Sequence, residues 1–177
     1  MSDVKEDFEK EFFMCVNLLR ENPLAFVTYM QTYINQGKKQ GDSQTMFNNI
    51  HKKLKSLDKL DPIEINANGS KACYLNLSKN ENNKSLIQDG AVKEYKIISK
   101  KDKSGMEPKD YCKKSWVGSA LELVCDMLLS FYITDLNMQK DHFLIDKKTA
   151  QMGMSYYKMR DGNNLFQVLY ILDHNQS

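Results

Sequence analysis

The run MCVNLLRENPLAF, residues 14–26, constrains the fold of this chain more than any other segment. Proline cannot continue a helix but fits the first turn of one, so the run predicts a helix that ends at Asn22 and another that begins at Pro23. Arg20 lies near the end of the first helix, and the chain has two arginines against 23 lysines. A guanidinium can bind two acceptors at once through its planar fork, which an ammonium cannot do. We therefore expect Arg20 to have a specific role that a lysine could not fill.

The composition is that of one globular domain. The chain has 177 residues, of which 41% are hydrophobic and 27% are charged, and this length is sufficient to bury one core. The formal net charge of +2 does not favour nucleic acid or an anionic membrane surface as a partner. No apolar run approaches the length of a membrane span, and the acidic start MSDVKEDFEKEFF is unlike a signal peptide. We expect a cytoplasmic protein with 1–177 as a single domain.

The four cysteines form no C-x-x-C pair. Three of them lie on the apolar side of expected helices, so buried thiols in a reducing compartment are favoured over disulfides. A secreted form is the alternative, and its paired cysteines would resist alkylation. The positions are Cys15, Cys73, Cys112 and Cys125.

Apolar residues at helical spacing predict four helices in the first half of the chain. Asp3 and Glu6 form a capping box for the first helix, and Asn22 caps the second. A third helix ends at an Asp-Pro pair, and either Asn66 or Asn68 caps a short fourth one. Residues of the first helix that are expected to face the core include Phe8, Phe12, Met14, Cys15 and Leu19.

Residues 80–114 are rich in Lys, Asn, Ser and Asp. We expect a long polar surface excursion there, with strand character only at residues 95–99. Regular structure then resumes at a capping box formed by Ser119 and Glu122, which stabilises a helix by about 1 kcal/mol. The helix that it opens, residues 121–133, is apolar on almost every face and should be buried from both sides.

The chain closes with two expected strands, Thr149–Lys158 and residues 165–172. The sequence Arg-Asp-Gly-Asn between them is typical of a hairpin turn. Helices followed by a terminal antiparallel hairpin predict a layered α+β domain.

Asn17, Arg20, Pro23 and Phe26 form the spacing Asn-x-x-Arg-x-x-Pro-x-x-Phe in the first helix and just after it. This spacing resembles the first helix of the CAP superfamily, which includes plant pathogenesis-related proteins, cysteine-rich secretory proteins and SCP-like domains of bacteria and protists. The resemblance implies an α-β-α layered single domain, and the Lys- and Asn-rich composition favours a protist source. Later landmarks follow in the family's order, namely the helix at 70–76, the turn Gln88-Asp89-Gly90, the helix at 121–133, His142 and Met152-Gly153-Met154.

The resemblance also implies a cavity built from two histidines and two acidic residues, which in some members binds a divalent metal. Most of that set is missing in this chain. Two histidine positions fall at Asn76 and Ser85, and a glutamate position falls near Lys114. His142 alone matches, and one histidine beside a lysine does not hold a zinc ion. We therefore expect a degenerate cavity with no metal, no other cofactor and no catalytic activity.

His142 has two interpretations, as a proton carrier with a pKa near 6.5 or as a histidine hydrogen-bonded to the chain inside a filled cavity. We favour the second, because no motif places a partner carboxylate near it.

The expected function is that of a non-catalytic structural or protein-interaction subunit in a larger intracellular assembly, for example a cytoskeletal or ciliary one. Residues 80–114 and 132–141 are the expected contact surfaces. Three methionines in polar stretches, Met106, Met138 and Met159, also favour a protein partner. Two alternatives stay open. One is a lipid- or sterol-binding module, and the other is a metal-dependent hydrolase with an unrecognised site.

Overall fold

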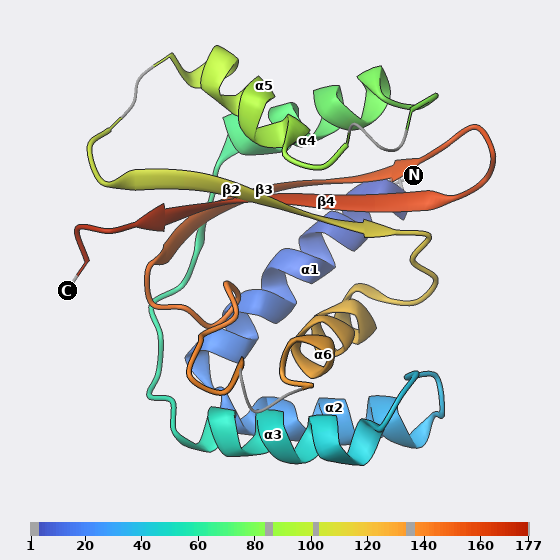
Figure 1. The fold of residues 1–177 in the computed structure, drawn as a ribbon, viewed down its shortest axis with the longest axis vertical. Coiled ribbons are helices and arrows are strands. Elements are labelled where there is room, and N and C mark those ends of the chain that lie inside the picture. The colour runs from blue at the N-terminus through green and yellow to red at the C-terminus, as the bar shows by residue number, and fades with distance from the viewer. Residues whose placement is uncertain (1–3, 84–86, 101–102, 134–136, 177) are drawn as a thin grey trace. The chain divides into compact units, whose positions relative to one another are not determined.

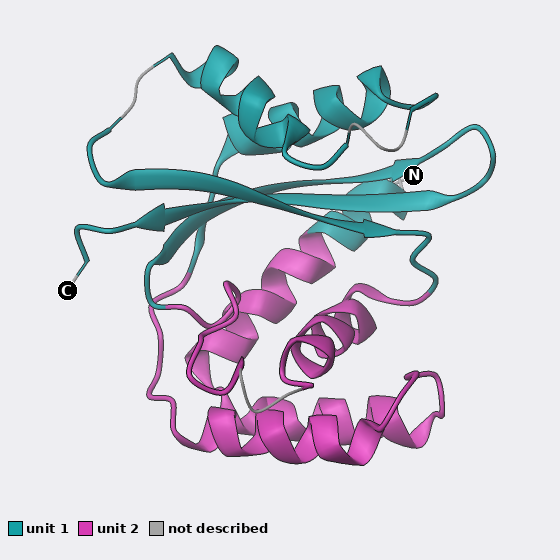
Figure 2. Ribbon diagram, viewed as in Figure 1, with its two compact units in different colours: residues 1–9, 63–117, 147–177 teal, residues 10–62, 118–146 magenta. Residues whose placement is uncertain are grey.

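The structure, a computed structural model, describes residues 4–83, 87–100, 103–133 and 137–176. Its helices and mixed sheet confirm the α+β fold class and the C-terminal antiparallel hairpin (Figure 1). The chain divides into two compact units, which we describe separately (Figure 2). Unit 1 comprises residues 1–9, 63–117 and 147–177, and unit 2 comprises residues 10–62 and 118–146.

A four-stranded sheet in the order β1-β3-β4-β2 forms the centre of unit 1. The short strand β1 (Glu64–Ile65) is parallel to β3 (Thr149–Lys158). Strand β4 (Asn164–Asp173) is antiparallel both to β3 and to β2 (Met106–Lys114). The β3–β4 turn lies where the sequence predicted it, and Gly162 within it has a φ of 90°.

Helices α4 (Ala67–Lys79) and α5 (Gly90–Ser99) cover one face of this sheet (Figure 1). Of the two caps that the sequence offered for α4, the structure uses Asn66, whose Oδ1 accepts a hydrogen bond from the Gly69 N–H at 2.8 Å. The helices and the sheet share a buried apolar cluster, made up of Ala72, Cys73, Ala91, Leu169 and Ile171.

The described part of residues 80–114 is more regular than its composition suggests, and the prediction of a strand at residues 95–99 was wrong. Residues 95–99 belong to helix α5 rather than to a strand, and β2 is hydrogen-bonded along β4. The apolar face of α5 is narrow, since Ala91 is buried while Tyr95 and Ile98 pack partly buried against the same cluster. Strand β2 lies at the edge of the sheet, where charged residues and proline are common. Both elements therefore have a polar composition.

Unit 2 is helical among its described residues. Helix α1 (Val4–Glu21) has its first residues in unit 1 and the rest in unit 2. A 3-10 turn, η1 (Leu24–Phe26), separates α1 from the next helix, so the predicted break after Asn22 is confirmed. Three further helices pack against one another, namely α2 (Val27–Asn35), α3 (Ser43–Lys55) and α6 (Ala120–Phe131).

Helix α6 has the start and the burial that its sequence predicted. The Ser119 side chain accepts from the Glu122 N–H at 3.1 Å, and the Glu122 carboxylate accepts from the Ser119 N–H at 3.2 Å, which completes the capping box. Every side chain from Leu123 to Leu129 is buried. No helix within the described ranges combines the length and the apolar character needed to cross a membrane.

A few residues differ from expectation. Met14 was expected in the core, but its side chain is 69% exposed, and Val16 takes the buried position on that turn of α1. Met159 was expected at the surface, but the hairpin turn places it against Leu77, Ile87 and Leu165, where it is buried. The proposed capping box of the first helix includes Asp3, which lies outside the described residues.

Candidate functional site

The buried guanidinium of Arg20 binds three backbone carbonyl groups within unit 2. Its Nε donates to the Asp61 carbonyl at 2.7 Å, and its Nη1 donates to the Leu144 and Asp146 carbonyls at 3.0 Å each. Burial lowers the pKa of Arg20 to about 10, although the nearby Asp146 and Asp61 carboxylates act in the opposite direction. The expected binding of several acceptors by one fork is confirmed, and Arg20 ties together segments that are far apart in sequence. Pro23 of the same motif is buried, and Asn17 is partly exposed.

The His142 side chain is buried in unit 2 and makes local contacts. Its Nδ1 accepts from the Leu144 N–H at 3.1 Å, and the His142 N–H donates to the Tyr132 hydroxyl at 3.0 Å. The ring lies against Phe131 and Phe143, with centroids 5.1 and 4.6 Å away. Burial lowers the pKa of His142 from 6.5 to about 3, so the imidazole is neutral with its proton on Nε2. The surroundings are those of a histidine hydrogen-bonded to the chain inside filled space.

The depressed pKa of His142 predicts acid sensitivity. In the unfolded chain this group takes up a proton near pH 6.5, whereas in the fold it does so near pH 3. Its contribution to stability is therefore present above pH 6.5 and is lost as the pH falls toward 3, by about 1.4 kcal/mol per pH unit. H142N, whose Oδ1 can accept from Leu144, should lose about 2 kcal/mol less than the wild type between about pH 7 and about pH 4.5.

Urea unfolding at both pH values measures this difference. His51→Asn is the control, because His51 is only partly buried. This variant should lose as much unfolding free energy between the two pH values as the wild type does. Parallel loss of stability in H142N and the wild type would contradict the assignment.

Two other expected cavity positions, Asn76 and Lys114, lie in unit 1. The Asn76 side chain is buried on α4, where its Nδ2 donates to the Ile87 carbonyl and to Gln167 Oε1, both at 2.9 Å. Its Oδ1 accepts from the Asn80 side chain at 2.9 Å. Lys114 is exposed at the end of β2, and Ser85 falls outside the described residues. Asn76 thus bridges α4, the segment before α5, and β4.

In the portion of the chain that the structure describes, no group of three or more His, Cys, Asp or Glu side chains could hold a metal ion. Burial raises the pKa of Cys15 and Cys112 to about 11 and that of Cys125 to about 12, and it also raises the pKa of Cys73. These thiols are therefore protonated and weakly nucleophilic at neutral pH.

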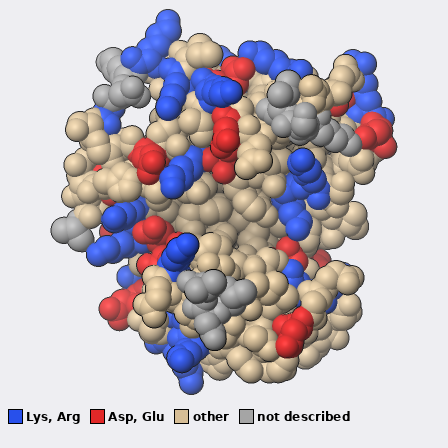
Figure 3. Space-filling model, viewed as in Figure 1, with Lys and Arg blue, Asp and Glu red and all other residues tan. Residues whose placement is uncertain are grey.

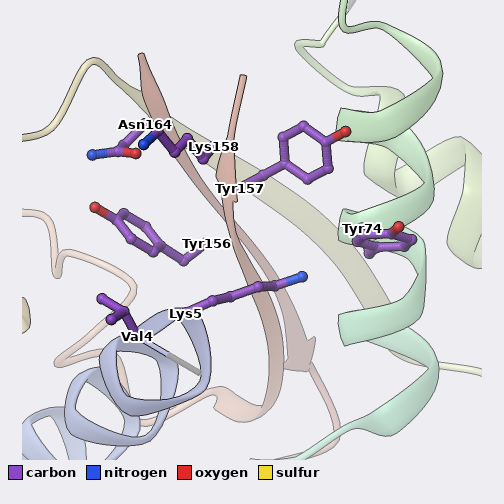
Figure 4. A pocket seen from close by; sticks show the side chains of 7 residues that line it. All are labelled: Val4, Lys5, Tyr74, Tyr156, Tyr157, Lys158 and Asn164. Atoms are coloured by element: carbon purple, nitrogen blue, oxygen red, sulfur yellow. The ribbon is translucent and has the colours of Figure 1, made fainter. Parts of the chain in front are cut away.

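A surface groove of unit 1 gathers aromatic and cationic side chains that the sequence analysis did not single out (Figure 4). Its volume is about 560 Å³, and its walls come from the start of α1, from α4 and from the ends of β3 and β4 that flank their shared turn. We call it the tyrosine groove. Its lining residues are Val4, Lys5, Tyr74, Tyr156, Tyr157, Lys158 and Asn164.

Two of its tyrosines are fixed by their neighbours. The Tyr156 ring stacks on Phe8 with centroids 4.2 Å apart, and the Tyr156 N–H donates to the Glu9 carboxylate at 2.9 Å. The Tyr157 hydroxyl donates to the Glu81 carboxylate at 3.2 Å. Burial and this carboxylate raise the pKa of Tyr157, so the hydroxyl stays protonated. Successive residues of a strand point to opposite faces, and these two rings therefore flank the end of β3 (Figure 4).

Another wall of the groove is formed by Tyr74 and Lys5. The Lys5 Nζ lies 4.5 Å from the centroid of the Tyr74 ring, which is a cation–π distance. The Tyr74 side chain is 46% exposed, and its ring lies 5.9 Å from that of Tyr157. The lining residues include two lysines, Lys5 and Lys158, and no acidic residue.

The positive character of this groove is local. On the face drawn in Figure 3, basic and acidic side chains are intermixed, in keeping with the formal net charge of +2. The sequence carried one weak signal for the site, the tyrosine pair followed by lysine at the end of a strand. No sequence signal indicated that Lys5 and Tyr74 lie close together.

Comparisons with known proteins assign no family to this chain, since no family model, curated protein or solved structure matches it.

Proposed function

We propose that this protein is a non-catalytic interaction subunit of a larger assembly, and that the tyrosine groove is its binding surface. The observation that carries the proposal is the exposed Tyr74 ring beside two fixed tyrosines and two lysines. Tyrosine combines a large contact area with low side-chain entropy, and it is enriched among residues that dominate binding energy. The proposal retains the CAP-like resemblance, with a degenerate cavity and a cytoplasmic setting such as a cytoskeletal or ciliary complex.

The contacts of the expected cavity residues support a structural role for them. The Arg20 guanidinium holds backbone carbonyls, the His142 ring accepts from a backbone N–H, and the Asn76 amide bridges α4 to neighbouring segments. Each of these polar side chains is buried and hydrogen-bonded within its own unit. The groove, by contrast, presents aromatic faces and ammonium groups toward the surface, where a partner can reach them.

Truncation of Tyr74 tests the proposal. Tagged wild-type protein should co-purify from mild lysates with a discrete, stoichiometric set of proteins. We expect Tyr74→Ala to reduce the recovered partner at least about tenfold, because loss of a central aromatic contact costs about 2 kcal/mol of binding free energy. Quantitative mass spectrometry of the eluates measures the ratio.

Tyr29→Ala is the matched control. Tyr29 is a tyrosine of unit 2 that is 42% exposed, close to the value for Tyr74, and the same truncation there should leave recovery unchanged. Full recovery of the partner by Tyr74→Ala, or a free monomer in the wild-type lysate, would contradict the proposed function.

A further inference from the structure

We infer that the tyrosine groove takes an acidic peptide segment, in which Asp or Glu residues flank an aromatic or aliphatic side chain. The inference rests on the proposed function and specifies the chemistry of the partner. Its first support is charge complementarity, because Lys5 and Lys158 line the groove and no acidic residue does. Two carboxylates beside the groove accept hydrogen bonds from its tyrosines, Glu9 from the Tyr156 N–H and Glu81 from the Tyr157 hydroxyl.

The edge of β3 does not favour addition of a partner strand at this place. The pairing with β1 covers only Gln151 and Met152, so the rest of this edge needs other hydrogen-bond partners. Side chains supply some of them, with Ser70 Oγ accepting from the Met154 N–H at 3.1 Å and Glu9 accepting from the Tyr156 N–H. The Met154 and Tyr156 N–H groups, which an added strand would need as donors, are thus already hydrogen-bonded. A partner is therefore recognised by the side chains of the groove.

A cationic ligand does not suit the groove either. Three tyrosines could in principle surround an ammonium group, but the Lys5 Nζ already lies over the Tyr74 ring. A second cation would meet the charge of Lys5 and that of Lys158. The complementary ligand has a carboxylate for the exposed Lys158 ammonium group and an apolar side chain for the exposed part of the Tyr74 ring.

Peptide binding tests the inference directly. The probe is a fluorescein-labelled peptide, Gly-Glu-Glu-Phe-Glu-Glu-Gly, and its comparison peptide has glutamine in place of each glutamate. Fluorescence anisotropy with the full chain should show binding of the acidic peptide that is about tenfold tighter than binding of the glutamine peptide. Affinity for the acidic peptide should fall several-fold as salt rises from about 50 to about 500 mM, because exposed charges are screened.

Charge reversal within the groove provides the residue-level test. K158E should weaken binding of the acidic peptide about fivefold, as expected for loss of an exposed ion pair and its replacement by repulsion. K55E makes the same change of net charge at an exposed lysine of unit 2, and it should leave the affinity unchanged. Both sites are at the surface, so both variants should fold.

The possible results separate the inference from the proposed function. Equal affinity for the two peptides, or equal effects of K158E and K55E, would overturn the inference. If the acidic peptide fails to bind while Tyr74→Ala still loses its cellular partner, the inference falls and the proposed function stands. If Tyr74→Ala keeps its partner, the proposed function itself falls.

Discussion

Replacement of Arg20 by lysine is expected to lower the free energy of unfolding by about 3 kcal/mol. The guanidinium of Arg20 holds the carbonyls of Asp61, Leu144 and Asp146 through two of its nitrogens. An ammonium group carries the same charge, but as a single point it cannot meet all three carbonyls. At least one buried acceptor is then left without a donor, and the charge is less well compensated. Chemical denaturation at neutral pH measures the loss.

Arg160 is the other arginine of the chain and serves as the control. Its side chain is 86% exposed, and its Nε lies 3.7 Å from the Glu81 carboxylate. Arg160→Lys should therefore change the free energy of unfolding by no more than about 0.5 kcal/mol. Similar small effects at positions 20 and 160 would show that Arg20 does not fix the carbonyl segments of unit 2.

Gly153→Ala is expected to destabilise unit 1 by about 3 kcal/mol, or to prevent it from folding. A Cβ at Gly153 would lie 2.1 Å from the Ser70 nitrogen, 2.3 Å from the Gly69 carbonyl carbon and 2.7 Å from the Asn66 oxygen. All three are backbone atoms at the start of α4, so no side chain can rotate away to make room. Strand β3 and α4 would have to separate, and the cluster beneath them would lose its packing. Thermal unfolding followed by circular dichroism detects the change.

Gly162→Ala provides the comparison within the same unit. A Cβ there meets no atom within 4 Å, but the residue has a φ of 90°, which disfavours alanine. The expected loss is about 1 kcal/mol, from backbone strain alone. The close contact of β3 with α4 would be refuted if Gly153→Ala were no less stable than Gly162→Ala.

Features that depend on neighbouring residues could be predicted from the sequence. The break after Asn22 follows from a proline that fits only the first turn of a helix. The start of α6 follows from Ser119 and Glu122, three residues apart, and its burial follows from an apolar sequence on every face. The hairpin follows from two strand-forming segments on either side of a turn sequence. Each of these signals lies within one contiguous segment of the sequence.

Features that depend on distant contacts could not be predicted. Helix α5 has few apolar residues because Ala91, Tyr95 and Ile98 suffice for its narrow contact with the sheet. Strand β2 is polar because it lies at an edge. The sequence indicated that the Arg20 guanidinium would bind several acceptors. It did not indicate that Leu144 supplies one of them, because 124 residues separate Leu144 from Arg20.

The tyrosine groove illustrates the same limit. Lys5, Tyr74 and Tyr157 come from three elements, and only the packing of α1 and α4 against the sheet brings them together. Taken singly, each has an ordinary sequence context. Lys5 lies in the acidic start of a helix, Tyr74 on a helix surface and Tyr157 near the end of a strand. A site of this kind becomes visible only when the fold is known.

Site-specific photo-crosslinking in cells tests the central claim most directly. A photoreactive phenylalanine derivative is placed at position 74 in one variant and at position 29 in another, and both positions are exposed tyrosines in the native chain. We predict a discrete protein adduct from position 74, suppressed by excess acidic peptide, and no such adduct from position 29. Absence of an adduct at position 74, or the same adduct from both positions, would contradict binding through the tyrosine groove.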